Sequence, residues 1–479
     1  MSLKKQALSG FFWSLLQIVG TQGLSLVVSL ILARLLLPAE FGLIAMLGIF
    51  IGLGTTLIGG GLTQSLIRSE AVDEEDYATV FYFNLVGSVL VYVLVFAIAP
   101  AIAVFYKQDL LTNVVRLYSL TFIINAFSAI QLTRLTKLLD FKTQLKVSIP
   151  SLLVGSTVGI IMAYKGYGVW SLVWSGIIQA TASTIQIWFW AKWKPIRKFN
   201  LIKFKYHFSY GYKLMLSGLL DTVFTNAYLI IIGRYFAPAQ VGYYSRADTL
   251  SILPVGIINT IITKVTFPLF SSIQNEEERL KTIYIKIMQM VIFLSAPVLV
   301  LMAALGEPLF RFLFTEKWLP AVPYFQILCF TAIMYPIHGY NLQILIVRGR
   351  SDLFLKLEIL KKVMIALIIL FSFQFGIYGL LYGGLILSVV GFFVNTHYSG
   401  KYLNYSAWQQ TKDLLPIILL SVTVGSAIYF LDLFCSRSGI IDFARLCIGG
   451  IIGITSYIGL SYLFKISSLS ELILIIKPK

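Results

Sequence analysis

The sequence predicts an all-α membrane protein with about fourteen transmembrane helices, and two observations carry that prediction. First, 58% of the 479 residues are hydrophobic and 12% are charged, and the mean hydropathy is +0.84. A soluble domain carries about 25% charged residues, and a single core could not bury this much apolar surface. Second, the apolar stretches are about 20 residues long, which fits membrane-spanning helices, whereas the strands of a transmembrane β-barrel need only about 10. These observations exclude a soluble fold and a β-barrel.

The apolar segments that we expect to form the helices follow one another with short loops between them. The first is too long for a signal peptide and lacks a convincing cleavage site, so we expect it to remain as the first span. A basic interruption at 191–208 divides the series in two. The segments cover 10–34, 41–63, 80–105, 113–133, 147–164 and 168–190 before the interruption, and 209–236, 243–268, 283–305, 321–347, 358–375, 377–398, 414–431 and 441–464 after it.

Lysine and arginine are distributed unevenly between the loops on the two sides of the membrane. If the amino terminus is cytoplasmic, about 27 of them face the cytoplasm and about 10 face the other side. This bias predicts that both termini are cytoplasmic, and it explains most of the net charge of +17 without any nucleic-acid partner. The basic residues of 192–213 are expected to contact anionic headgroups of membrane lipids, and the acidic run 73–76 is interpreted as the start of a helix.

A motif at the end of the first predicted helix recurs at the end of the seventh. Six helices separate the copies, so both face the same side of the membrane, which predicts two six-helix lobes related by a pseudo-twofold axis along the membrane normal. The expected domains are an N-terminal lobe at 1–200, a C-terminal lobe at 201–403, and two further helices in 404–479. The copies share four residues at a constant offset of 200 positions, namely Arg34, Pro38, Ala39 and Gly42 in the first and Arg234, Pro238, Ala239 and Gly242 in the second.

Sequence signatures of catalysis are absent. The histidines, His207, His338 and His397, are not spaced as metal ligands with one another, with cysteine or with a carboxylate. The glycine-rich stretch 52–61 follows no strand and lacks the lysine of a phosphate-binding loop, so helix packing explains it. We therefore expect the chain not to be an enzyme and to need no metal or cofactor.

Charged residues within the predicted helices are candidate functional residues. Each costs about 2.5–3.5 kcal/mol at the bilayer centre unless it is paired or faces water. Asp221, in the seventh segment, either carries a coupling ion or proton or forms a hydrogen bond to Thr222 or Asn226. Lys264, in the eighth, either extends to the inner interface or lines a cavity.

Three arginines are further candidates for a cationic cavity. Arg246 either faces that cavity or forms a local ion pair with Asp248, which joins Asp221 as a candidate for ion coupling. Arg34 and Arg234 end equivalent helices of the repeat, where they either cap the loop or contact a substrate.

Uncharged polar side chains recur at helical spacing on the helices that open each predicted lobe. Gln17, Thr21 and Ser25 share one face of the first segment. Thr225 lies one turn beyond the candidate carboxylate of the seventh segment, and Asn259 lies on the eighth. Hydrogen bonds between helices would explain such stripes, but their coincidence with the repeat favours a hydrated cleft between the lobes.

Four stretches of the chain resemble a known family. They read ARLLLPAEFGLIAM at 33–46, GLTQSLIR at 61–68 before the acidic run, LLDFK at 138–142 and GYYSRA at 242–247. They are similar to the Wzx-type polysaccharide flippases, in particular the WzxC-like branch, within the superfamily of multidrug, oligosaccharidyl-lipid and polysaccharide exporters. The resemblance covers essentially the whole chain.

The resemblance implies a flippase that moves undecaprenyl-pyrophosphate-linked oligosaccharide, such as an O-antigen or exopolysaccharide repeat unit, across the bacterial inner membrane. It implies two six-helix lobes around a cationic cavity and alternating access, coupled to H⁺ or Na⁺, and it makes the polysaccharide polymerase machinery a candidate partner. Because a pyrophosphate favours arginine or lysine donors, Arg246, within a matching motif, is assigned to the cavity.

Other functions stay open at this point. A cation-coupled multidrug exporter of the same superfamily would suit Asp221, and a flippase for the peptidoglycan precursor would share the fold. A membrane-embedded polymerase or ligase would need large outer loops with catalytic residues, and the longest predicted outer loop, at 306–320, is too short for them.

Overall fold

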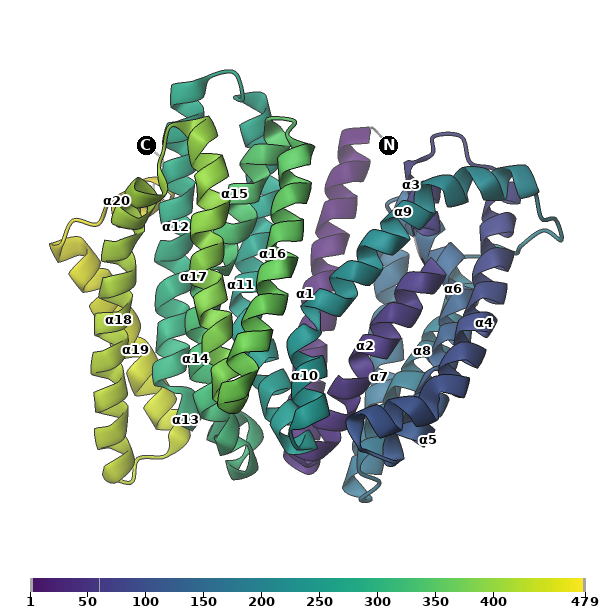
Figure 1. Ribbon diagram of the computed structural model, residues 1–479, viewed down its shortest axis with the longest axis horizontal. Helices are drawn as coiled ribbons and strands as arrows, with labels where there is room; N and C mark the ends of the chain where they lie inside the picture. Colours follow the sequence, from purple (N-terminus) through teal and green to yellow (C-terminus); the bar gives the residue numbers. More distant parts are fainter. Residues whose placement is uncertain (1–2, 60, 477–479) are drawn as a thin grey trace. The chain divides into compact units, whose positions relative to one another are not determined.

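The computed structural model describes residues 3–59 and 61–476, and this part of the chain contains helices and no strand. The prediction of an all-α fold is therefore confirmed. Packing divides the chain into two compact units, Met1–Gly242 and Tyr243–Lys479. Each unit is a bundle of long helices joined by short loops (Figure 1).

The first unit contains ten helices and the start of an eleventh, α11. They are α1 (Leu3–Leu35), α2 (Pro38–Gly59), α3 (Leu62–Arg68), α4 (Glu74–Tyr106), α5 (Leu110–Tyr118), α6 (Leu120–Lys137), α7 (Phe141–Tyr164), α8 (Val169–Trp190), α9 (Leu201–Thr225) and α10 (Ala227–Tyr235), followed by α11 (Pro238–Ser272).

The second unit contains the remainder of α11 and the helices that follow it. They are α12 (Glu277–Ala304), α13 (Gly306–Phe314), η1 (Glu316–Ala321), α14 (Val322–Ile333), α15 (Tyr335–Val347), α16 (Ser351–Ser372), η2 (Phe373–Phe375), α17 (Gly376–Leu403), α18 (Ala407–Arg437), α19 (Asp442–Leu463) and α20 (Ser467–Ile476).

Each expected apolar segment coincides with a helix or with a pair of consecutive helices. Among the described residues, ten helical segments are long and apolar enough to cross a membrane, or eleven when α9 and α10 are taken as one broken span. The chain is thus a multi-pass membrane protein. The number fourteen stays a prediction, because α8 and α11 fall outside this set and α16 and α17 are merged within it.

The boundary between the compact units lies at Gly242, whereas the boundary between the expected lobes lies at 200. Helices α9 and α10 pack against α2, and α9 also packs against α3 and α4, which places both helices in the first unit. The expected lobes follow from sequence duplication rather than from packing, so the division at 200 and at 403 remains a prediction.

The acidic run 73–76 begins α4, as expected. The Asp73 carboxylate accepts hydrogen bonds from the backbone N–H groups of Glu75 and Asp76 at 2.9 and 3.0 Å, and the Asp76 carboxylate accepts from the Asp73 N–H at 3.0 Å. This capping box satisfies N–H groups that have no partner within the helix. At the other end of α4, Lys107 stops the helix in a left-handed conformation, with φ 54°.

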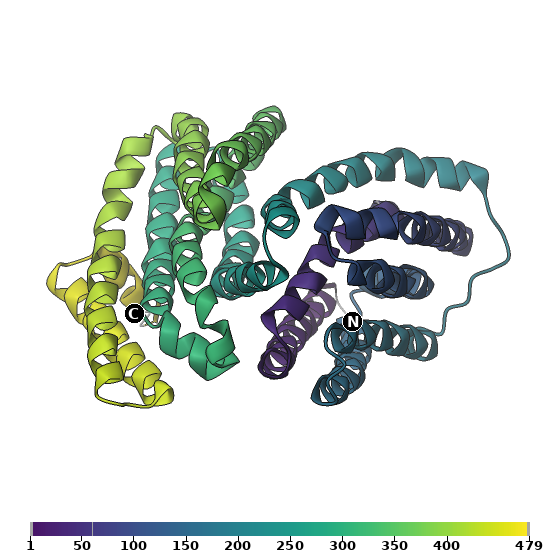
Figure 2. The same cartoon turned by 60° about the horizontal axis from the view of Figure 1, so that its bottom comes forward.

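Small residues let α7 and α8 approach closely. A Cβ on Gly155 would lie 2.6 Å from the Gln179 Cβ, and one on Gly159 would lie 2.8 Å from the Ser175 Cβ. The four-residue spacing puts both glycines on one face of α7, the arrangement by which membrane helices bring their backbones together. Figure 2 shows several helices of this unit nearly end-on, while α9 runs across the view.

Helices α18 and α19, the two that we expected beyond the second lobe, pack against α12 in the second unit. Gly425 of α18 faces Val300, and Gly453 of α19 faces Leu301. The Arg445 guanidinium of α19 binds the Asp432 carboxylate of α18 through two hydrogen bonds of 2.9 and 2.8 Å, and both side chains are buried. Such a pair holds the two helices in register, because removal of either partner would leave a buried charge.

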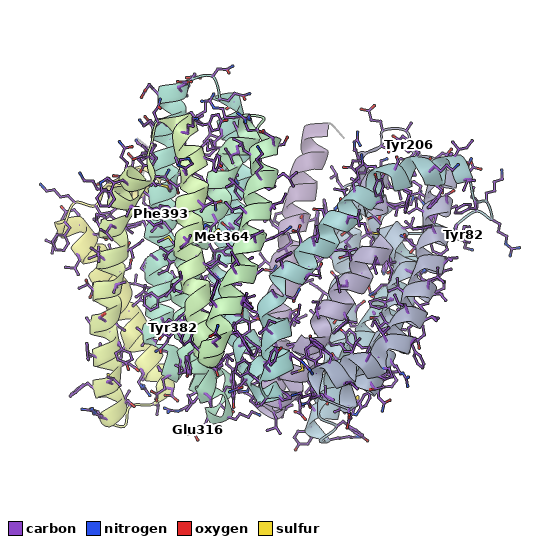
Figure 3. The ribbon with its side chains drawn as sticks, in the orientation of Figure 1. Tyr82, Tyr206, Glu316, Met364, Tyr382 and Phe393 are labelled. Carbon is purple, nitrogen blue, oxygen red and sulfur yellow. The ribbon has the colours of Figure 1, made fainter. Side chains whose placement is uncertain are left out.

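Large apolar side chains cover the outside of the helices. Figure 3 shows Tyr382 and Phe393 along α17, where they are 53% and 45% exposed. In a soluble protein such a surface would aggregate, but in a bilayer it contacts acyl chains.

Candidate functional site

The two copies of the repeated motif have the same local structure. The first joins α1 to α2, the second joins α10 to α11, and in both a proline is the first residue of the second helix. The backbone hydrogen bonds recur at the same offset: the Leu36 N–H donates to the Leu32 carbonyl at 2.8 Å, and the Phe236 N–H donates to the Ile232 carbonyl at 2.9 Å. Proline suits this position because its missing N–H would have no partner in the first turn of a helix.

The two copies also contact each other within the first unit. A Cβ on Gly42 would lie 1.8 Å from the Pro238 carbonyl oxygen, and a Cβ on Gly242 would lie 2.0 Å from the Pro38 carbonyl oxygen. Each glycine thus meets the proline of the other copy, a reciprocal contact of the kind a twofold axis produces. The first turns of α2 and α11 touch through their backbones, which explains why this position is glycine in both copies.

Arg34 and Arg234 lie in the last turns of α1 and α10. The Arg234 Nη1 donates hydrogen bonds to the Val104 and Phe105 carbonyls, which are among the last of α4, and its guanidinium lies 5.1 Å from the centre of the Phe105 ring. A cation at this position interacts favourably with the negative end of the α4 dipole. Arg34 is exposed at its helix end.

Asp221 and Thr225 lie, exposed, in the last two turns of α9. The expected seventh span is broken directly after them, since α9 and α10 meet at Asn226 with a bend of 47°. The Asn226 side chain donates to the Thr222 carbonyl at 2.8 Å, and the Asn226 backbone N–H donates to the same carbonyl at 3.2 Å, so Asn226 caps the end of α9. The Thr222 hydroxyl lies 3.5 Å from that of Thr56, where α9 crosses α2.

The polar stripe of the first helix is present on α1. Gln17 and Thr21 are half-buried and Ser25 is exposed. The Thr21 hydroxyl donates to the Gln17 carbonyl one turn earlier at 2.6 Å, so this hydroxyl is satisfied within its own helix.

The candidates of the second unit all lie on α11, which continues as one helix through Pro254. Arg246, Asp248 and Asn259 are half-buried. The side chain of Lys264 lies outside the described side chains.

A dense group of charges that we did not expect as a unit joins α4 to α9. This charge cluster consists of Asp73, Glu75, Asp76, Lys203 and His207. The Lys203 ammonium lies 2.5 Å from the Asp73 carboxylate, 3.2 Å from that of Asp76 and 3.5 Å from that of Glu75. The hydrogen bond from Lys203 is the main reason why the pKa of Asp73 lies well below its usual value.

The most deeply buried member of the charge cluster is His207, of which 1% is exposed. Its Nε2 lies 3.2 Å from the Asp76 carboxylate, and its Nδ1 lies 2.8 Å from the Ser65 hydroxyl of α3. The acidic run 73–76 and the basic stretch 192–213 were both visible in the sequence, but their pairing depends on how α9 packs and not on spacing along the chain.

Within the described part of the chain, no group of histidine, cysteine or carboxylate side chains could hold a metal ion. The charged residues form pairs and caps at helix ends instead. The long apolar helices and the charges paired at their ends are those of a multi-pass membrane protein.

Comparison of the structure with solved proteins shows which fold the chain has. The fold is similar to that of the lipid II flippase MurJ in an inward closed conformation, with a TM-score of 0.73 over 95% of this chain and 98% of that one, at 13% identity. It is also similar to an inward-facing multidrug transporter of the MATE family, with a TM-score of 0.58 over 83% of this chain and 99% of that one, at 16% identity.

The sequence identifies the family within this class. The chain belongs to the polysaccharide biosynthesis protein family, whose profile matches residues 31–323. It is 26% identical to the teichuronic acid biosynthesis protein TuaB of Bacillus subtilis over 74% of this chain and 73% of that one. It is 23% identical to the lipopolysaccharide biosynthesis protein WzxC of Escherichia coli over 89% of both, and 25% identical to the succinoglycan biosynthesis transport protein ExoT of Rhizobium meliloti over 65% of this chain and 63% of that one.

Proposed function

We propose that this protein is a flippase that moves a lipid-linked oligosaccharide, carried on undecaprenyl pyrophosphate, across the bacterial inner membrane. The observation that carries the proposal is that relatives named for lipopolysaccharide biosynthesis and succinoglycan transport match most of the chain, on a fold similar to that of a lipid flippase. The protein acts as a transporter rather than as an enzyme.

Alternating access between two lobes fits the repeated motif. The reciprocal contact of Gly42 with Pro238 and of Gly242 with Pro38 supports a pseudo-twofold relation between the two copies. The polar stripe of α1 and the exposed Asp221 and Thr225 of α9 supply the water-facing side chains that a hydrated cleft requires.

The orientation follows from the distribution of lysine and arginine. Both termini are cytoplasmic in this proposal, so α4 and α10 end at the outer face of the membrane. The partners are membrane lipids, the glycan-bearing lipid, H⁺ or Na⁺ as coupling ion, and the polysaccharide polymerase machinery.

The pyrophosphate of the substrate needs cationic donors. We assign this role first to Arg246, which lies in the GYYSRA stretch, and propose Arg34, Arg234 and Lys264 as further donors. Guanidinium groups bind phosphate oxygens through pairs of charge-assisted hydrogen bonds, which gives them the geometry for this task.

The experiment that tests this function uses proteoliposomes and an undecaprenyl-pyrophosphoryl oligosaccharide with a fluorescent sugar. Dithionite, which does not cross the membrane, quenches only the molecules in the outer leaflet, so translocation appears as loss of protected fluorescence. We expect Arg246→Ala to slow translocation at least about tenfold, because charge-assisted hydrogen bonds contribute about 1.5–3 kcal/mol each.

The matched control is Arg437→Ala, since Arg437 is exposed in the last turn of α18 and its replacement removes the same charge. This variant is expected to translocate the lipid at the wild-type rate. A wild-type rate for Arg246→Ala would remove Arg246 from the substrate path, and no translocation by wild-type protein would reject the function.

Because the fold is similar to those of MurJ and of a multidrug transporter, two alternative substrates are tested as well, namely lipid II and a cationic drug. The same vesicles distinguish them when they are loaded with labelled lipid II or with a cationic dye. Transport of the dye with no transport of either lipid would favour multidrug export, for which an exposed carboxylate within a membrane helix, such as Asp221, would be the coupling group.

A further inference from the structure

An apolar pocket of about 390 Å³ lies on the outside of the first unit, between α2, α4, α9 and α10. Its nine lining residues are aliphatic or aromatic, and Tyr106 carries the one hydroxyl among them. Ile98, Phe105 and Val223 line the pocket and are 38%, 41% and 39% exposed, so it opens to the surroundings of the helices.

The break between α9 and α10 borders this pocket. Val223 lies before the bend at Asn226 and Ile230 lies after it, and both line the pocket. The opposite wall is α4, from Ile98 to Tyr106. These eight steps along a helix cover about 12 Å, so the pocket occupies one leaflet of a hydrocarbon core about 30 Å thick.

A cation lies at the end of the pocket that is nearest the membrane surface. Arg234 follows Ile230 by one turn of α10 and so projects from the same face of the helix. Its guanidinium lies over the ring of Phe105, which forms the wall of the pocket. The nearby Lys107, directly after α4, is exposed and adds a second positive charge at this level.

We infer that this pocket binds an anionic phospholipid of the leaflet at which α4 and α10 end, with an acyl chain between α2, α4, α9 and α10 and the phosphate at Arg234. A lipid-facing hollow with apolar walls is filled by the chains of the surrounding bilayer, which excludes water from it. The guanidinium selects among these lipids for negative charge.

A phospholipid is a better occupant than the polyprenyl carrier on mass action. Bilayer phospholipids are the solvent of the protein, and a scarce lipid competes with them only if it binds far more tightly. The inference does not rest on the flippase function, and it gives Arg234 a role other than the contact with substrate proposed above. Because the acyl chain would contact Val223 of α9 and Ile230 of α10 at the same time, the bound lipid would also stabilise the bend between these two helices.

The test is native mass spectrometry of the full chain in mild detergent, titrated with dioleoyl phosphatidylglycerol, dioleoyl phosphatidylethanolamine or undecaprenyl phosphate. We expect the wild type to bind the first phosphatidylglycerol about tenfold more tightly than phosphatidylethanolamine. We expect Arg234→Gln to remove the preference for phosphatidylglycerol. This variant should bind both phospholipids with the weaker affinity that the wild type has for phosphatidylethanolamine. Ala101→Phe fills the pocket and weakens the binding of both lipids.

Two controls match these variants. Arg437→Gln removes an exposed arginine of the second unit, and Ala97→Phe places the same ring at an exposed position of α4 outside the pocket. Both are expected to bind as the wild type does. Size-exclusion and thermal melting show whether Ala101→Phe is folded, and the smaller Ala101→Leu replaces it if it is not.

Three outcomes would overturn the inference. The wild type could bind the two phospholipids equally, or a folded Ala101 variant could bind them as the wild type does. Undecaprenyl phosphate could displace phosphatidylglycerol at equal concentration, which would make the carrier lipid the occupant.

Discussion

At the scale of single residues, two backbone carbonyls decide which amino acids the repeated motif accepts. The Pro238 carbonyl occupies the space of a side chain at Gly42, and the Pro38 carbonyl occupies that at Gly242. Backbone cannot move aside as the end of a flexible side chain can, so even a methyl group would push α2 and α11 apart.

We therefore expect Gly42→Ala and Gly242→Ala each to destabilise the protein by about 1–3 kcal/mol, the usual result of inserting a methyl group into a close contact. The measurement is thermal melting in detergent, followed by fluorescence-detected size exclusion. The control is Gly48→Ala, also on α2, where no atom lies within 4 Å of the added Cβ and the better helix propensity of alanine favours folding. Equal melting temperatures for Gly42→Ala and Gly48→Ala would contradict the close contact.

At the scale of elements, the charge cluster fixes the start of α9 to the start of α4. Lys203 lies within salt-bridge distance of three carboxylates, and His207 connects the same surface to α3 through Ser65. An exposed ion pair contributes little, but Asp76 is 8% exposed and shares its carboxylate between two partners from α9. The cluster thus holds α9 against the first unit at one end, while the bend at Asn226 begins α10 at the other.

We expect Lys203→Met to destabilise the start of α9 and to be coupled to Asp76→Asn by about 0.5–3 kcal/mol in a double-mutant cycle. Hydrogen exchange of the first turns of α9 measures the effect. Lys205→Met, an exposed lysine of the same helix, is the control and should leave exchange unchanged. Additive effects of the two substitutions would show that the contact contributes nothing.

The contact between Lys203 and Asp73 stabilises the folded protein to a degree that depends on pH, and the sign of this dependence follows from the pKa of Asp73. Because Lys203 lowers the pKa of Asp73 in the folded protein, the stabilisation is present above the ordinary carboxyl pKa of about 4. It is lost as the pH falls through the lowered pKa, so the wild type and Lys203→Met should converge in stability only in strong acid.

At the scale of the whole molecule, the proposed transport function has an ion gradient drive the exchange between two access states. An imposed potential of about 100 mV supplies about 2.3 kcal/mol for each charge that moves. Asp221 is the residue that we propose binds the coupling ion, since it lies exposed on a membrane helix one turn before the break between α9 and α10.

We expect Asp221→Asn to abolish the response of translocation to imposed H⁺ and Na⁺ gradients while downhill movement of the lipid continues. The dithionite assay, run with and without each gradient, measures this. Asp109→Asn, at the exposed start of α5, removes the same charge and should leave the response intact. An unchanged response in Asp221→Asn would assign coupling to another group, with Asp248 as the next candidate.

Much of the element order could be predicted from the sequence. Apolar length predicts a helix because every backbone polar group in a bilayer must be satisfied within its own segment. The break at Asn226 was missed, because no proline or glycine marks it and Asn226 was considered as a hydrogen-bond partner of Asp221. The role of Arg234 at the end of α4 was missed in the same way, since the carbonyls it binds lie about 130 residues earlier in the chain.

What the sequence determined by itself is the class of protein, the succession of its helices, the repeat and its family, because these depend on composition, on length and on motifs read locally. Only the tertiary structure decided that the glycine of each motif copy contacts the proline of the other copy. It also decided that the acidic run 73–76 pairs with Lys203 and His207, and that a pocket beside Arg234 opens between α2, α4, α9 and α10. Such contacts join residues that lie far apart along the chain, and helix packing selects them from many pairings that the same charges and small residues would permit.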